Sequence, residues 1–94
     1  MKELKINDSK QDIVSAIDKN KEKIFKFVKE NRKSKSIVNV NGNEFIAYYK
    51  KGNRKDLYEE AIFLNLVLHK EDNYIITGAF SYKIIKHSDK LIVM

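Results

Sequence analysis

The chain has 94 residues, a formal net charge of +6 and no cysteine. This length suits one domain with one hydrophobic core, and the lack of cysteine excludes disulfide scaffolds and thiolate-bound zinc or iron–sulfur sites. The start lacks the continuous apolar stretch of a signal peptide, and the longest apolar stretch, Ala61 to Leu68, is too short to span a bilayer. We therefore expect a single domain over residues 1–94 that is cytoplasmic and has no membrane partner.

The first predicted element is an amphipathic helix over residues 9–32. Asp8 or Ser9 can cap its free amide groups, and Asp12 stands at the capping-box position. Lys21 falls within the apolar arc, so a break near this lysine is the alternative to one continuous helix. Six apolar side chains share the face that should meet the core, namely Ile13, Val14, Ile17, Ile24, Phe25 and Val28.

A β-hairpin should follow the helix. Two strand-like segments, 36–40 and 44–49, flank the dipeptide Asn41-Gly42. Asn and Gly accept the positive φ angles of a type I′ turn, which joins two antiparallel strands through a two-residue loop. This loop length sets Val38 opposite Phe45.

The excess positive charge is concentrated in one quarter of the chain. Residues 32–55 hold seven Lys or Arg and one acid. Extended past the strands, the hairpin register sets Lys33 opposite Lys50 and Arg32 opposite Lys51, so these cations should meet at its open end. Such a patch can neutralise phosphates, and nearby tyrosines can stack on bases. The predicted residues for binding nucleic acid or another partner are Arg32, Lys33, Lys35, Tyr48, Tyr49, Lys50, Lys51, Arg54 and Lys55.

The middle of the chain predicts a loop followed by a buried strand. Residues 50–56 are polar, and residues 57–60 can form a short turn of helix. Residues 61–69 are apolar at both odd and even positions, which is typical of a central strand covered on both faces.

The remaining residues predict further antiparallel pairs. A turn at Glu71-Asp72 leads into a strand over 74–80, which sets Leu64 opposite Ala79. A last hairpin should join 82–86 to the apolar segment that ends the sequence, Leu91 to Met94. We expect that segment to pair within the sheet, and a homodimer through this C-terminal strand is the alternative. The expected fold class is α+β, with one N-terminal amphipathic helix packed on an antiparallel sheet of about five strands.

Few residues are candidates for catalysis or metal binding. His69 and His87 are the only histidines, and neither has a carboxylate at a recognised ligand spacing. The adjacent acids at Glu59-Glu60 and Glu71-Asp72 are typical of solvated charge. The three glycines stand too far apart for a phosphate-binding loop. We therefore predict no catalytic residue, no metal and no cofactor.

The stretch from Phe63 to Phe80 resembles the paired strands near the end of barnase-like and RelE-like ribonuclease toxins. The resemblance covers about a fifth of the chain. It implies an RNase that places a basic residue, a His and a Thr or Ser around the scissile phosphate. In the predicted register Thr77 and His69 lie on opposite faces of the sheet, so an RNase would need a histidine beside Arg54 or Lys55.

Three functional hypotheses follow. The leading one is a small, basic, non-enzymatic protein that binds nucleic acid or a nucleoprotein complex, as accessory or inhibitor proteins of phages and mobile elements do. The second is a small ribonuclease toxin. The third is an inhibitor domain that binds an acidic protein surface.

Overall fold

The computed structural model describes residues 2–54, 57–70, 73–87 and 90–94, without the side chains of 53–58 and 68–80. These residues form a mixed α+β structure in which one sheet of six strands is accompanied by two helices. In chain order the elements are β1 (Glu3–Ile6), α1 (Ile13–Lys19), α2 (Lys21–Glu30), β2 (Ser36–Val40), β3 (Asn43–Arg54), β4 (Leu57–Lys70), β5 (Asn73–His87) and β6 (Lys90–Val93).

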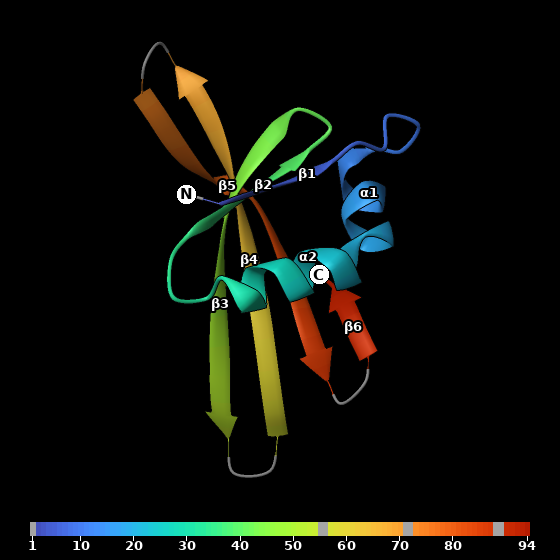
Figure 1. The fold of residues 1–94 in the computed structure, drawn as a ribbon, viewed down its shortest axis with the longest axis vertical. Helices are drawn as coiled ribbons and strands as arrows, with labels where there is room; N and C mark the ends of the chain where they lie inside the picture. Colours follow the sequence, from blue (N-terminus) through green and yellow to red (C-terminus); the bar gives the residue numbers. More distant parts are fainter. Residues whose placement is uncertain (1, 55–56, 71–72, 88–89) are drawn as a thin grey trace.

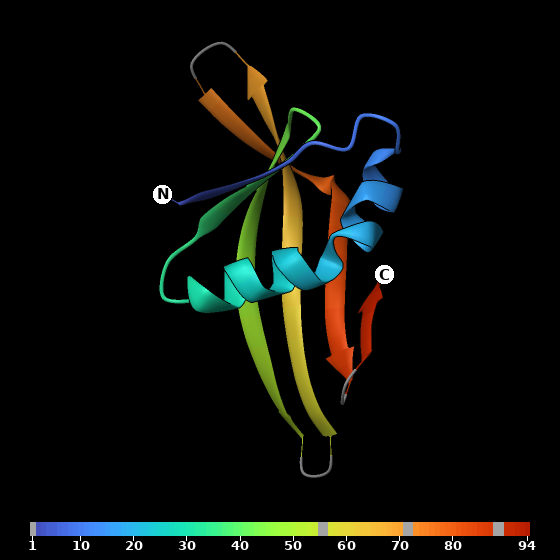
Figure 2. The same cartoon turned by 45° about the vertical axis from the view of Figure 1, so that its right-hand side comes forward.

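The sheet follows the order of the chain from β1 to β6. β1 and β2 are parallel, and the two helices form the crossover between them, whereas all other neighbours are antiparallel. Figure 1 shows the curled sheet with both helices on one side. Figure 2 shows α2 lying across β3, β4 and β5. The sheet therefore has a helix-covered face and an opposite face, which we call the helix-free face.

The α+β class is confirmed, but the sheet has six strands and one parallel pair rather than about five antiparallel strands. No strand was predicted for the first residues. β1 forms there because Ile6 is buried and Leu4 packs against the core on the same face. Its pairing with β2 is extended by the Asn41 amide, which donates to the Ile6 carbonyl at 2.9 Å.

The predicted single helix over residues 9–32 is wrong, because the segment forms two helices. Asp12 is the N-cap of α1, and its Oδ1 accepts a hydrogen bond from the Ser15 amide at 2.7 Å. This bond holds the pKa of Asp12 below its usual value. Asn20 ends α1, where its side chain donates to the Ala16 carbonyl at 2.8 Å. The break moves Lys21 to the edge of the apolar face, where it pairs with Asp18.

The apolar helix face is largely as predicted. Ile17, Ile24, Phe25 and Val28 are buried, and Ile13 packs against the core at its edge. Val14 is the exception, because its side chain is 49% exposed. The core fills the space between the helices and the helix-covered face, where Val38, Val40, Phe45, Ala47, Ile62, Leu64 and Ile84 are also buried.

The hairpin turn is confirmed. Asn41 and Gly42 have φ angles of 52° and 87°, and Val38 lies opposite Phe45. The Asn41 side chain also ties the turn to the loop after β1. Its Oδ1 accepts from the Asp8 amide at 2.6 Å, and its Nδ2 donates to the Asp8 carbonyl at 2.9 Å.

The next hairpin is much longer than predicted. The polar segment that begins at Lys50 continues β3 up to Arg54 instead of forming a loop. The predicted turn of helix at residues 57–60 is the start of β4. Cross-strand pairs run without a break from Phe45 to Arg54, so the register of the whole β3–β4 hairpin is fixed.

β5 departs from the predicted register halfway along. Its residues 77–80 lie opposite Leu66 alone, because the pairing shifts at this point. The shift brings Tyr82, not Ala79, opposite Leu64. The two strands predicted here are thus one irregular strand. β6 pairs with β5 inside the sheet, which was the expected arrangement for the C-terminal segment.

We expect Ile17→Ala to lower the free energy of unfolding by about 2–4 kcal/mol, because the side chain is completely buried and its loss leaves a cavity. Val14→Ala on the same helix should cost less than about 0.5 kcal/mol, because Val14 is 49% exposed. Chemical denaturation of both variants measures the difference. Equal losses would show that α1 does not dock through Ile17.

Candidate nucleic-acid interface

Side chains alternate along β3, and this alternation divides the predicted binding residues between two faces. Ala47 and Tyr49 point to the helix-covered face, where Ala47 is buried. Tyr48 and Lys50 therefore point to the helix-free face. The Tyr48 side chain is 40% exposed.

The basic residues before β2 do not join the strands. Arg32, Lys33 and Lys35 are exposed in the turn between α2 and β2. The predicted pairing of Lys33 with Lys50 is wrong, because β2 begins only at Ser36, which lies opposite Ala47. Arg32 instead caps the end of α2, where its Nη1 donates to the Lys29 carbonyl at 3.1 Å.

Lys51 is likewise separated from Lys50, because it lies opposite Glu60 on the strand side that carries the helices. It is not opposite Arg32, as predicted. The side chain of Arg54 and the whole of Lys55 lie outside the described residues. The same holds for the side chains of His69 and Thr77, which the ribonuclease resemblance singles out.

Tyr49 has a structural environment. Its neighbour across α2 and β4 is Glu60, which is only 1% exposed and accepts a charged hydrogen bond from Lys29. Lys29 Nζ lies 2.9 Å from Oε2 and 3.1 Å from Oε1 of that carboxylate. Burial raises the pKa of the Tyr49 hydroxyl, and the negative charge of Glu60 and a hydrogen bond to it raise this pKa further. Tyr49 thus belongs to the contact between α2 and the sheet.

The helix-free face carries a row of three side chains from adjacent strands, which we call the stacking row: Tyr48, Phe63 and Lys83. These residues lie directly opposite one another on β3, β4 and β5. The Tyr48 and Phe63 rings are stacked, with centroids 5.0 Å apart and planes within 10°. Lys83 Nζ lies 5.3 Å from the Phe63 centroid, at cation–π distance.

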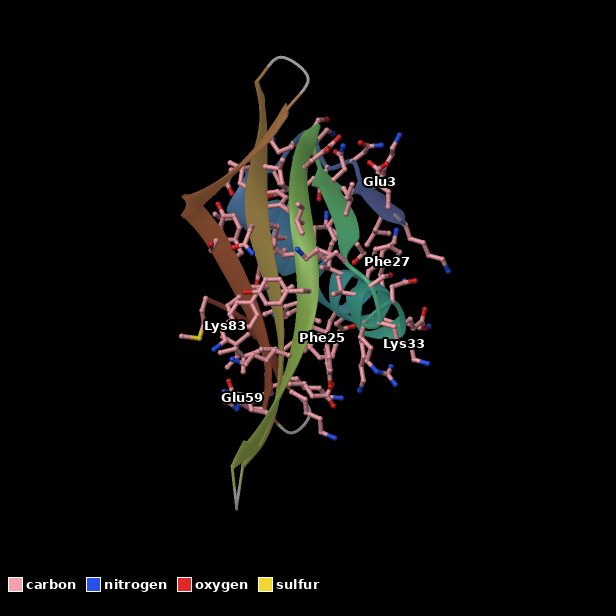
Figure 3. The ribbon with its side chains drawn as sticks, turned by 90° about the vertical axis from the view of Figure 1, so that its left-hand side faces the viewer. Glu3, Phe25, Phe27, Lys33, Glu59 and Lys83 are labelled. Carbon is pink, nitrogen blue, oxygen red and sulfur yellow. The ribbon has the colours of Figure 1, made fainter. Side chains whose placement is uncertain are left out.

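A shallow depression of about 150 Å³ adjoins the stacking row. Gly52 leaves room for it, because glycine has no side chain at this position of β3. Glu59 pairs with Lys83 across it at 3.7 Å. The depression is lined by Lys50, Gly52, Glu59, Ala61, Phe63 and Lys83. Figure 3 shows Glu59 and Lys83 on the side of the sheet away from Phe27 and Lys33.

The same face exposes further apolar side chains near β6. Met94 exchanges backbone hydrogen bonds with Lys83 at 2.8 and 3.3 Å, and Ile92 lies opposite Ile85. Ile92 is 45% exposed and Met94 is 70% exposed. Together with Tyr48, they place an apolar strip beside lysines on a face that no helix covers.

Phe63 and Lys83 were not among the predicted binding residues. The signal for Phe63 was its place in a strand that is apolar at both parities, which indicated burial. Lys83 was predicted to lie in a strand, but its neighbours depend on the register shift in β5. The row is visible only when the β3–β4 pairing reaches Tyr48, beyond the end of β2.

The described residues contain no group of three or more His, Asp or Glu side chains that could hold a metal ion. Neither α1 nor α2, the helices of the described residues, is long and apolar enough to cross a membrane. Comparisons with protein-family models, with curated proteins and with solved structures find no match.

Tyr49 should make stability fall in alkali. Its pKa is raised in the folded state, so the folded protein keeps this proton longer than the unfolded chain does. The contribution is fully present below the ordinary value of 10.0 and is lost as the pH rises through the folded-state pKa. Tyr49→Phe should reduce this alkaline loss.

Denaturant unfolding between about pH 8 and pH 12 measures the effect. Tyr48→Phe on the opposite face is the matched control and should keep the wild-type dependence. The same alkaline slope in the wild type and in Tyr49→Phe would contradict the proposed environment.

Proposed function

We propose that the protein binds single-stranded nucleic acid on its helix-free face. Bases stack against Tyr48 and Phe63, and phosphates bind Lys50 and Lys83. The observation that carries the proposal is the exposed, parallel pair of aromatic rings with a lysine beside it. Aromatic rings on a sheet beside cationic side chains form a recurring platform for unpaired bases.

Single strands fit this face better than a duplex. Bases in a duplex are stacked on one another and hide their flat surfaces, so aromatic side chains contact them only after the bases separate. The stacking row offers ring surfaces rather than an element that enters a groove. The expected affinity depends on the number of bases that stack, because each contributes about 1–3 kcal/mol.

The charges near the row favour a polyanion. Lys50, Lys83 and Lys90 lie on the helix-free face, against Glu59 at the same end of the sheet. Lys83 is already held over Phe63 by its contact with Glu59. A phosphate can take the place of that carboxylate without moving the lysine far. An accessory or inhibitor protein of a phage or mobile element that covers exposed single strands would use such a surface.

A protein partner is the second candidate, and the exposure of Ile92 and Met94 favours it. Both residues lie on or next to β6, an edge strand of the sheet within the described residues. An edge strand with apolar side chains can pair with a second copy of the chain. An acidic protein surface could instead contact the neighbouring lysines.

Tyr48→Ala should weaken binding of a short labelled DNA strand by about 5- to 150-fold, because one stacked base contributes about 1–3 kcal/mol. Lys50→Glu combined with Lys83→Glu should weaken it further. The parent's log–log dependence on salt should become less steep by about 1.4, at about 0.7 for each lost phosphate contact on a single strand. Fluorescence polarisation at several salt concentrations measures both effects.

Lys33→Glu is the matched control, because Lys33 is equally exposed but lies in the turn after α2. It should change binding far less than Lys50→Glu. If Lys33→Glu is the more harmful change, binding occurs at the turn. Binding that ignores salt, Tyr48 and both strand lysines would favour the protein partner.

A homodimer through β6 predicts a concentration-dependent mass in light scattering. Ile92→Lys should then return the protein to the monomer with little loss of stability, because the side chain is 45% exposed. Ser81→Lys is the control on the same face, away from β6. A monomer at every concentration in the parent protein would remove the homodimer.

A further inference from the structure

A carboxylate and an imidazole lie opposite each other beside the stacking row. Glu59 of β4 pairs with His87 of β5 in the sheet register. Side chains at directly opposite positions have Cβ atoms about 4.5–5.5 Å apart and lie on the same face. Both residues therefore belong to the helix-free face, two same-face positions along β4 from Phe63.

Lysines complete the surroundings of this pair. Lys83 Nζ lies 3.7 Å from Glu59 Oε1 and also 5.3 Å from the centre of the Phe63 ring. Lys50 lines the depression beside Glu59. A strand whose base stacks on the row would thus bring its phosphates to two ammonium groups, next to a carboxylate and an imidazole.

We propose that Glu59 and His87 cleave RNA bound on the helix-free face. The Glu59 carboxylate takes the proton of a ribose 2′-hydroxyl, and the 2′-oxygen forms a bond to the adjacent phosphorus. The bond from phosphorus to the 5′-oxygen breaks, and protonated His87 gives its proton to that oxygen. The products are a 2′,3′-cyclic phosphate and a free 5′-hydroxyl, and the step needs no other reactant.

Each group has a separate duty in this step. An acid and a base placed on opposite sides of one phosphodiester are what general acid–base catalysis requires. Lys50 and Lys83 stabilise the charge that develops on the phosphate oxygens. The pair differs from the predicted absence of catalytic residues. It also differs from the ribonuclease resemblance, which points to His69 and Thr77.

The inference rests on the proposed function, and the two are tested with separate strands. A labelled DNA strand with one central ribonucleotide has a single bond that can be cleaved this way, whereas the all-DNA strand reports binding alone. Wild-type protein should cleave the first strand at the ribonucleotide and leave a 2′,3′-cyclic phosphate.

Glu59→Gln and His87→Gln should each lower the cleavage rate by about 10²- to 10⁴-fold, the usual contribution of a general acid or base. Both variants should still bind the all-DNA strand, which also shows that they fold. Glu3→Gln is the matched control: Glu3 belongs to β1, at the opposite edge of the sheet (Figure 3), and its variant should cleave like the wild type.

Binding without cleavage would overturn this inference and leave the proposed function standing. Cleavage that persists in both variants would also overturn it, because the activity would then come from other groups. If the wild-type protein binds neither strand, the proposed function fails and the inference fails with it.

Discussion

The ion pair between Lys29 and Glu60 sets the face on which every β4 side chain lies. Glu60 is buried under α2, where Lys29 and the Tyr49 hydroxyl compensate its charge. Shifting β4 by one residue would leave this carboxylate without α2 and would bury Glu59 instead. Removing either partner of a buried pair is costly, so the arrangement selects one register. Since β4 is fixed in this way, Phe63 must lie on the helix-free face.

Two adjacent acids therefore have unlike environments. Glu59 and Glu60 were both interpreted as solvated charge, and neither fits that description. Glu60 anchors the helix to the sheet, whereas Glu59 lies beside Lys83 at the edge of the depression. Strand geometry alone separates them, because neighbouring side chains point to opposite faces. The same geometry gives Tyr49 a structural role and leaves Tyr48 on the open surface.

Local signals in the sequence were sufficient for some elements but not for others. The Asn41-Gly42 turn was predictable because its backbone angles depend on two residues. The buried helix face was predictable from its spacing, although Val14 escaped it because the helix breaks at Asn20. The long β3–β4 hairpin and the shift in β5 depend on distant pairing, which no local window contains. The stacking row depends on both, so it could not be predicted.

The parallel pairing of β1 protects the rest of the sheet. Without it, the outer edge of β2 would present unpaired amide and carbonyl groups between Ile37 and Val40, and such an edge is a template for aggregation. β1 covers that edge with only four residues, and its exposed positions, Glu3 and Lys5, are charged. Its ladder closes only after residues 7–35 have folded back, so β1 pays a larger loop-closure entropy than any hairpin in the meander. Newly made chains therefore pass through a stage in which the meander has formed and β2 is still bare, and the charged, short β1 ends that stage.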